Sequence, residues 1–287
     1  MNFLRENKGF VLGLILALFV FSLPTPEGLS IEAHRTAALF ILMGTWWATE
    51  AVPVAVTALV PLALFPLLGI VDIQDAANPY ANKTIYLFFG GFLIATAIQK
   101  WDLHKRIALF VLENAGSNGA SLIFGFMLTA AVISMWVMNT ATTIMLLPIG
   151  LAVVSVVKTT VNYLSEEDIE SFQLALLLGI AYGATIGGMS TLIGTGPNGM
   201  LAAFMADNYD LDISFVDWMK VGVPLSAVML PCSWFILTKV IFRVNFETSS
   251  ETRDLLSTMK NDLGELKGPE LKVLIVFFLT ALAWMFR

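Results

Sequence analysis

The chain has 287 residues, of which 57% are hydrophobic and 13% are charged, and its mean hydropathy is +0.79. This number of charged side chains is too small to cover the surface of a soluble domain. We therefore expect an all-α polytopic membrane protein with six or seven spans of about 20 residues. A net charge of −6 excludes a basic face for nucleic acid, and the single cysteine, Cys232, excludes a disulfide framework and a cysteine-based zinc site.

The first part of the chain contains four apolar segments, over residues 10–23, 36–49, 51–70 and 84–99, and three prolines interrupt the third. The first segment follows Arg5 and Lys8 and has the length of a signal-peptide core, but no A-x-A-like cleavage site follows it. We expect it to be retained as the first span, with cleavage as the alternative. Residues 101–114 mix apolar and charged side chains, which predicts an amphipathic helix along the membrane surface.

The segment from Ala120 to Val157 is apolar except for a polar cluster in its middle, which begins at Asn139. This pattern predicts two half-length helices that meet at a polar, re-entrant tip. Two full spans joined by a buried polar turn are the alternative.

A fifth span is predicted from Phe172 to about Ile193, followed by a break at residues 194–199 and a short helix through Ala206. Glycine and proline at membrane depth free backbone groups that lipid cannot satisfy, so the break must face protein or a water-filled cavity. The break contains a literal G-x-G-x-x-G, but a dinucleotide site needs a strand and a βαβ unit, and the chain has neither pattern. We interpret it as a discontinuous helix that offers carbonyls to a cation and free N–H groups to an anion.

Val221–Val240 is the sixth predicted span, residues 245–270 form a polar segment, and Leu271–Phe286 starts another span. Lysine and arginine predict the orientation, because they are enriched in cytoplasmic loops. With the N-terminus in the cytoplasm, most basic residues fall inside and four fall outside. Those inside are Arg5, Lys8, Lys100, Lys105, Arg106, Lys158, Lys239, Arg243, Arg253, Lys260, Lys267 and Lys272; those outside are Arg35, Lys83, Lys220 and Arg287.

The tip, Ser134–Thr140, offers amide, hydroxyl and backbone oxygens, the ligand type that hard cations such as sodium prefer. The alternative is that its polar side chains only join helices by hydrogen bonds. Glu50 lies beside two tryptophans and is interpreted as an interfacial charge, with a proton relay as the alternative. His34 and His104 have no metal-ligand neighbours at useful spacing. The sequence shows no catalytic Ser/His/Asp set or G-x-S-x-G turn, so we do not expect an enzyme.

Short stretches between residues 47 and 195 carry a resemblance to a known family, in this order: Trp47–Pro53, Phe89–Phe92, Trp101–Leu109, Asn139–Thr142, Gly179–Tyr182, Ile186–Gly188 and Thr191–Thr195. They resemble the divalent anion:sodium symporters. The resemblance implies sodium-driven uptake of dicarboxylates, tricarboxylates or sulfate across the plasma membrane. It further implies a homodimer with an elevator movement, and no cofactor besides sodium as the coupling ion.

By the same resemblance, residues 1–115 form a scaffold of four spans and the interfacial helix. Residues 116–244 contribute the re-entrant hairpin, the broken span five and span six to a transport domain. Residues 245–270 are a cytosolic linker, and residues 271–287 begin an inverted second repeat, so we expect the chain to be the N-terminal half of a transporter. A passive channel or a non-transporting scaffold built from a single repeat is the alternative.

The resemblance also implies two sets of site residues, with sodium as the only metal. The cation set is Ser134, Asn139, Gly187 and Gly188, and the substrate set is Asn139, Thr140, Thr195 and Pro197.

Two positions depart from the family pattern. Met138 stands where the Ser-Asn-Thr motif has serine, and Gly196 stands where the broken helix usually has the first of two prolines. A thioether is a poor ligand for a hard cation. We therefore expect no contact between the Met138 side chain and sodium.

Overall fold

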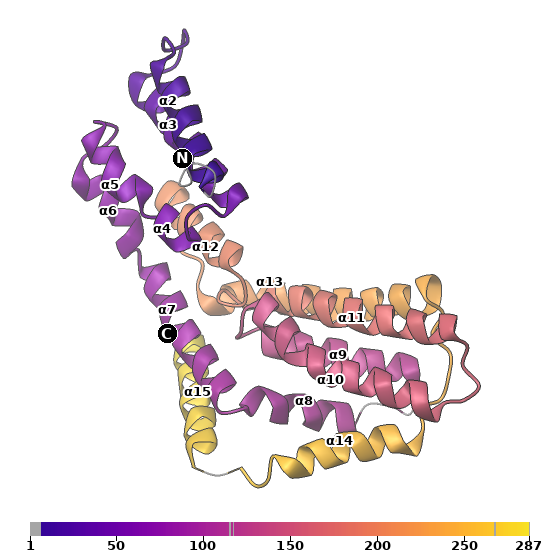
Figure 1. Cartoon of the computed structure of the whole chain (residues 1–287). Coiled ribbons are helices and arrows are strands. Elements are labelled where there is room, and N and C mark those ends of the chain that lie inside the picture. The colour runs from indigo at the N-terminus through magenta and orange to yellow at the C-terminus, as the bar shows by residue number, and fades with distance from the viewer. Residues whose placement is uncertain (1–6, 115, 117, 267, 287) are drawn as a thin grey trace. The chain divides into compact units, whose positions relative to one another are not determined.

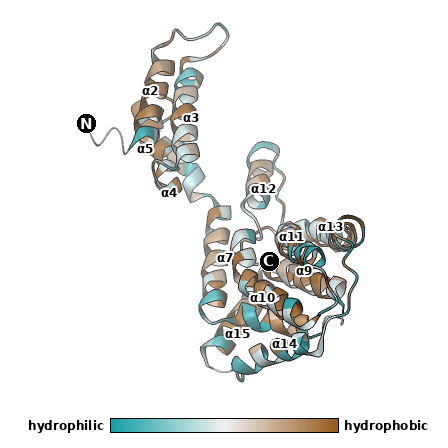
Figure 2. Cartoon of the chain, turned by 45° about the vertical axis from the view of Figure 1, so that its right-hand side comes forward, coloured by the Kyte–Doolittle hydropathy of each residue, from teal (hydrophilic) through white to brown (hydrophobic). Residues whose placement is uncertain are grey.

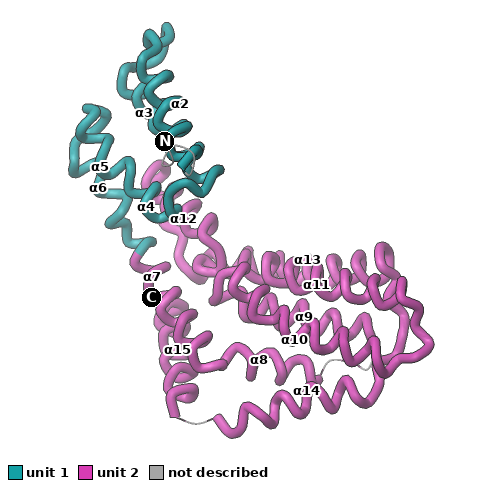
Figure 3. Tube along the Cα trace, in the orientation of Figure 1, with its two compact units in different colours: residues 1–85 teal, residues 86–287 magenta. Residues whose placement is uncertain are grey.

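The computed structural model describes residues 7–114, 116, 118–266 and 268–286, and this part of the chain is almost entirely helical (Figure 1). Three basic residues used to predict the orientation, Arg5, Lys267 and Arg287, lie outside the described residues. The chain divides into two compact units, residues 1–85 and residues 86–287, each with a hydrophobic core of its own (Figure 3).

Several helical stretches of the described chain are long and apolar enough to cross a membrane. They are Ile73–Lys100, Asn139–Thr160, Glu166–Gly188 and Phe215–Ile241. Hydrophobic residues also dominate shorter helices such as α2, whereas α14 carries many hydrophilic ones (Figure 2). The helices therefore agree with the multi-pass membrane protein that the composition predicts.

The first unit begins with α2 (Lys8–Ser22) and α3 (Ile31–Thr49), which pack against each other. Phe10 and Trp46 stack with ring centroids 4.9 Å apart, and the Trp46 indole donates to the Phe10 carbonyl at 3.1 Å. Ser30 caps the start of α3 by accepting from the Ala33 amide at 3.1 Å. Glu50 ends the helix in the left-handed conformation, with φ 49°.

The third predicted span is interrupted, as its prolines predict. It forms two short helices, α4 (Val54–Thr57) and α5 (Val60–Leu67), which are followed by α6 (Ile73–Ala77) and η1 (Asn78–Ala81). Pro53 precedes α4, and Pro61 lies in the first turn of α5. Proline lacks an amide hydrogen and clashes with a preceding helical turn, so it is favoured at a helix start, although Pro66 lies inside α5.

Helix α7 (Lys83–Lys100) leads into the second unit, and α8 (Leu103–Glu113) follows after a sharp joint. Asp102 forms this joint in the left-handed conformation, with φ 55°. His104 is buried, and its Nδ1 lies 3.2 Å from the Ile98 carbonyl oxygen at the end of α7. Burial lowers the pKa of His104, against the opposing effect of that hydrogen bond, so the imidazole is a neutral donor in the joint.

The amphipathic helix predicted at residues 101–114 is confirmed as α8. Its Ala108, Leu109 and Leu112 are buried in the main core of the unit. A second polar helix, α14 (Ser250–Asp262), packs along it, and α15 (Pro269–Met285) follows. Arg106 joins these elements, because it pairs with Glu270 of α15 at 2.6 Å and donates to the Gly264 carbonyl at 3.0 Å.

The predicted hairpin consists of α9 (Gly119–Ser134) and α10 (Asn139–Thr160). The two helices differ in length from the prediction, since α9 has 16 residues and α10 has 22. At 1.5 Å per residue α10 is about 33 Å long, the length of a full span. The prediction of two half-length helices is therefore wrong for α10.

The remaining helices of the unit are α11 (Glu166–Gly188), α12 (Gly196–Tyr209) and α13 (Phe215–Phe235), which continues as the π-helix η2 (Ile236–Ile241). Helices α9, α10, α11 and α13 lie side by side (Figure 1). Lipid tails are as apolar as leucine, so close packing holds such helices together. Gly187 allows this approach, because a Cβ there would meet the Ala131 backbone of α9.

Candidate functional site

The hairpin tip closes around two polar side chains. Helix α9 ends at Ser134, a short turn follows, and α10 begins at Asn139. The buried Ser134 hydroxyl donates to Asn139 Oδ1 at 2.8 Å, and the Val137 carbonyl oxygen lies 3.3 Å from the same hydroxyl. Trp136 anchors the turn by stacking on Phe215 of α13, with centroids 6.1 Å apart. The tip therefore holds an amide oxygen, a hydroxyl and backbone carbonyls within a few ångströms.

The break in the fifth span lies earlier than the sequence predicts. Helix α11 ends at Gly188 and not near Ile193, and α12 begins at Gly196. The predicted break at residues 194–199 is therefore corrected to residues 189–195. Pro197 accounts for the shift, because proline is disfavoured inside a helix but well placed in its first turn.

The tip and the break meet in one place, which we call the junction and define by Ser134, Asn139, Gly188, Thr191 and Gly194. The Thr191 hydroxyl donates to the carbonyl of Met135 in the tip at 2.5 Å. A Cβ on Gly194 would lie 2.9 Å from the Ser134 carbonyl oxygen. A Cβ on Gly188 would overlap the Asn139 amide. Glycine at Gly194 thus allows the two backbones to approach, and glycine at Gly188 leaves room for the Asn139 side chain.

The structure brings together three of the four predicted cation residues. Ser134, Asn139 and Gly188 are in the junction, whereas Gly187 packs on α9 through its Cα. The rest of the predicted substrate set is less buried. Thr140 and Pro197 are exposed, and Thr195 is half-buried at the start of α12.

The charge environment of the junction comes from helix ends. Residues 134–142 and 186–199 contain no ionisable side chain. Helices α9 and α11 end there, and their last carbonyls favour a cation, whereas α10 and α12 begin there and favour an anion. The junction can therefore offer partial charges of both signs without a fixed charge of its own.

The two helices that begin at the junction lack side-chain caps. Neither Met138 before α10 nor Thr195 before α12 makes a capping hydrogen bond. In the same unit, α9, α11 and α13 are capped by Asn118, Ser165 and Ser214. An uncapped N-terminus keeps free N–H groups, which an anionic ligand can satisfy in place of a cap.

Sequence reasoning missed several residues that hold the junction together. Thr191 is fully buried, and besides its bond to the tip it accepts from the Gly194 amide at 3.1 Å. Asn198 is buried in the first turn of α12, and its amide donates to the carbonyls of Gly188 at 2.9 Å and Thr191 at 2.7 Å. The sequence signal for these residues was a polar side chain next to a Gly/Pro pair. Such a pair interrupts the helix and leaves backbone carbonyls that need other hydrogen-bond donors.

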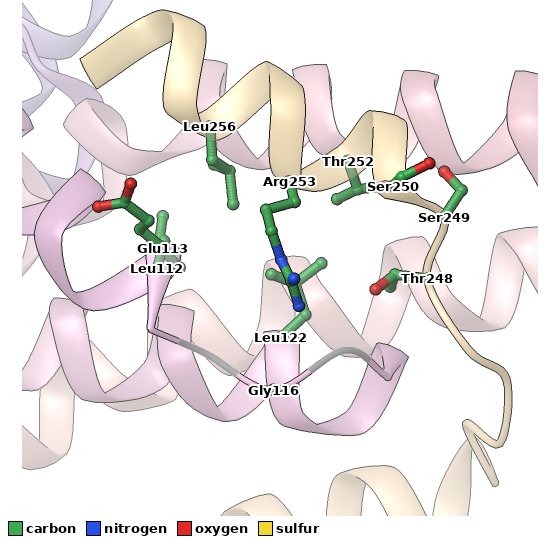
Figure 4. A pocket seen from close by; sticks show the side chains of 10 residues that line it. All are labelled: Leu112, Glu113, Gly116, Leu122, Thr248, Ser249, Ser250, Thr252, Arg253 and Leu256. Atoms are coloured by element: carbon green, nitrogen blue, oxygen red, sulfur yellow. The ribbon is translucent and has the colours of Figure 1, made fainter. Parts of the chain in front are cut away.

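A second polar hollow lies away from the junction. A cavity of about 220 Å³ opens between the end of α8, the start of α9 and the start of α14, and Arg253 extends into it (Figure 4). Glu113 also lines it and forms an ion pair with Lys260. The cavity shares no residue with the tip or the break.

Comparison with known proteins supports the family resemblance. The family described as "Sodium:sulfate symporter transmembrane region" matches residues 5–287. The chain is 36% identical over 292 residues to the sodium-dependent dicarboxylate transporter SdcS of Staphylococcus saprophyticus. This alignment covers 99% of the chain and 56% of the relative. The chain is 35% identical over 280 residues to SdcS of Staphylococcus aureus, covering 97% of the chain and 54% of the relative.

The chain thus spans about half the length of the curated relatives it matches. The family match covers the tip, the break and every helix described above. The chain therefore belongs to the sodium:sulfate symporter family, the divalent anion:sodium symporters that its sequence motifs resemble.

Proposed function

We propose that this chain forms part of a secondary transporter that couples sodium to the uptake of small anions of the dicarboxylate class. The observation that carries the proposal is the junction, where Asn139 Oδ1, the Ser134 hydroxyl and the end of α11 meet beside two uncapped helix N-termini. The named function of the staphylococcal relatives supports the same substrate class.

The absence of fixed charge at the junction gives a physical reason for coupling. Taking one ion out of water without a counter-ion is costly, and residues 134–142 and 186–199 supply no ionisable side chain. A cation at the oxygens of the tip and an anion at the N-termini of α10 and α12 compensate each other. Each ion therefore binds more tightly when the other is present, which favours the fully loaded site over a site that holds one ion.

The proposal includes an orientation. The open end of the hairpin lies beside the start of the polar 245–270 segment, since the Gly119 amide donates to the Phe246 carbonyl at 2.9 Å and the Thr160 and Ser249 hydroxyls are 2.7 Å apart. The distribution of lysine and arginine along the sequence favours a cytoplasmic location for both, in the plasma membrane. The scaffold and transport domains, the homodimer and the elevator movement are proposed from the family resemblance.

The test measures sodium-dependent uptake by the Asn139→Ala variant. The variant is made in the protein that the complete reading frame encodes, and it is reconstituted in liposomes. We expect the variant to fold and to lose sodium-driven accumulation of succinate, citrate and sulfate, because no neighbouring side chain replaces its amide oxygen. Asn208→Ala is the matched control, since the Asn208 amide donates only within α12, to the Phe204 carbonyl at 2.9 Å.

Accumulation against a gradient separates the proposal from its rival. A passive channel built from a single repeat equilibrates the anion with or without a sodium gradient. If Asn139→Ala is monodisperse and accumulates anion with the sodium dependence of the parent protein, the assignment of the cation site to the tip is refuted.

A further inference from the structure

Helical amides do not continue past the first residues of the break. The Met189 amide donates to the Ile186 carbonyl at 3.3 Å and the Ser190 amide to the Gly187 carbonyl at 2.9 Å. The carbonyls that follow, of Gly188 and Met189, need donors from elsewhere. A carbonyl without a partner at membrane depth is costly, and a peptide plane without a hydrogen bond is free to rotate. Any cation site made of these carbonyls depends on what holds them in place.

Helix α13 supplies two of the donors. The Ser226 hydroxyl donates to the Ile186 carbonyl at 2.7 Å, and the Trp218 indole donates to the Met189 carbonyl at 2.9 Å. These two carbonyls lie on either side of Gly188, which contacts Asn139. Ser226 is buried and Trp218 is half-buried, so both bonds are shielded from competing water.

The residue between the two donors allows the close approach. Trp218, Gly222 and Ser226 are four residues apart and therefore form one stripe along α13. A Cβ on Gly222 would lie 2.6 Å from the Met189 carbonyl oxygen and 3.0 Å from that of Ser190. The backbone of α13 thus lies directly against the break.

We propose that Trp218, Gly222 and Ser226 form a splint that holds the break carbonyls in position and thereby sets the affinity for sodium. This inference rests on the proposed function. A carbonyl oxygen has two lone pairs, so the bond from Trp218 fixes the peptide plane of Met189 and leaves its other lone pair for a cation. The Ile186 carbonyl accepts from both Met189 and Ser226, and these bonds fix the last turn of α11. The three splint residues are positioning residues, because they act through the backbone of the break. Fixed oxygens bind an ion more tightly than mobile ones, since the cost of ordering them is already met.

The test compares two tryptophans of α13 in the protein that the complete reading frame encodes. Trp218→Phe removes the indole donor and keeps a large ring. Trp234→Phe is the matched control, because Trp234 is also half-buried and donates to a backbone carbonyl, that of Ala120 at 2.7 Å, but at the open end of the hairpin. Uptake of succinate is measured over a sodium titration, and thermal stability is measured in sodium-free detergent.

We expect Trp218→Phe to raise the sodium concentration for half-maximal uptake about three- to tenfold, the effect of losing one hydrogen bond. The rate at saturating sodium should be largely retained, and Trp234→Phe should leave the sodium dependence unchanged. If the two tryptophans served folding alone, both variants would have a lower thermal stability and the same sodium dependence.

Ser226→Ala provides the second measurement if Trp218→Phe does not fold, because it removes one hydroxyl and little volume. It should shift the sodium titration in the same direction. The splint is refuted if every folded variant among Trp218→Phe and Ser226→Ala has the sodium dependence of Trp234→Phe. Absence of sodium dependence in the parent protein would instead refute the proposed function, and with it the splint.

Discussion

Gly188→Ala adds one methyl group at the point where α11 ends against the hairpin tip. An ideal Cβ on Gly188 would overlap the Asn139 amide, 3.0 Å from its Cγ and 3.2 Å from its Nδ2. The overlap is with the end of a side chain, so the helix can stay in place while the Asn139 amide moves. Helical backbone at Gly188 is compatible with alanine, so the strain falls on the site and not on the fold.

The magnitude follows from the cost of overpacking and of the displaced hydrogen bond. Forcing an extra methyl into a packed contact costs about 1–3 kcal/mol. The displaced amide also gives up its 2.8 Å bond from the Ser134 hydroxyl. If that cost is met only when sodium draws Asn139 back into place, the half-maximal sodium concentration rises by about 5- to 150-fold.

Gly44→Ala is the matched control, since Gly44 lies within α3 of the first unit, whereas the junction belongs to the second, and a Cβ there has open space within 4 Å. The assay is sodium-titrated uptake of succinate in liposomes, combined with thermal unfolding in detergent. We expect Gly44→Ala to match the parent protein and Gly188→Ala to need much more sodium at similar thermal stability. If Gly188→Ala shows the same sodium titration as Gly44→Ala, the contact between Gly188 and Asn139 has no role in cation binding.

Two further predictions concern the orientation and the departure from the family motif. Cysteines introduced at Ser249 and Asp210 should react differently with an impermeant thiol reagent in intact cells, with labelling at Asp210 and protection at Ser249, because the distribution of lysine and arginine predicts a cytoplasmic 245–270 segment. Labelling at Ser249 alone would reverse the topology. Met138→Ser should lower the sodium concentration for half-maximal uptake and relax the selectivity for succinate over citrate, because it adds a hydroxyl oxygen and removes bulk beside the site. Unchanged sodium titrations with both substrates would show that position 138 does not face the site.

The amphipathic helix was predictable because its signal is local. Charged and apolar residues alternate between residues 101 and 114 at helical spacing, and the structure buries the apolar face of α8 in the core. The polar tip was predictable for the same reason, since Ser134 and Asn139 interrupt a long apolar run. Both features can be recognised without knowing what packs against them.

The boundary of the break was not predictable from the same local signals. Glycine and proline suggested that the helix ends at Gly194, but Gly196 and Pro197 begin α12 instead. Proline favours a helix boundary without indicating on which side the helix lies, because it is disfavoured in the interior and accepted in the first turn.

The residues that hold the junction together depend on tertiary contacts. Thr191 bonds to Met135 across 56 positions, and Ser226 bonds to Ile186 across 40. In the sequence, each is one hydroxyl among many in an apolar stretch. Spacing alone cannot show that its partner is a carbonyl freed by a break elsewhere, so the supporting contacts required the structure.

Met138 shows how the junction can work without the family serine. A serine before α10 would give the cation a hydroxyl oxygen and would also cap the first amides of the helix. The Met138 side chain is 50% exposed and caps nothing. In the proposed site, the cation relies on Ser134, Asn139 and the carbonyls that the proposed splint holds. The first amides of α10 have no side-chain cap and are the proposed partners of a substrate carboxylate. Methionine at this position therefore weakens the proposed cation half of the site and leaves the α10 amides to its anion half.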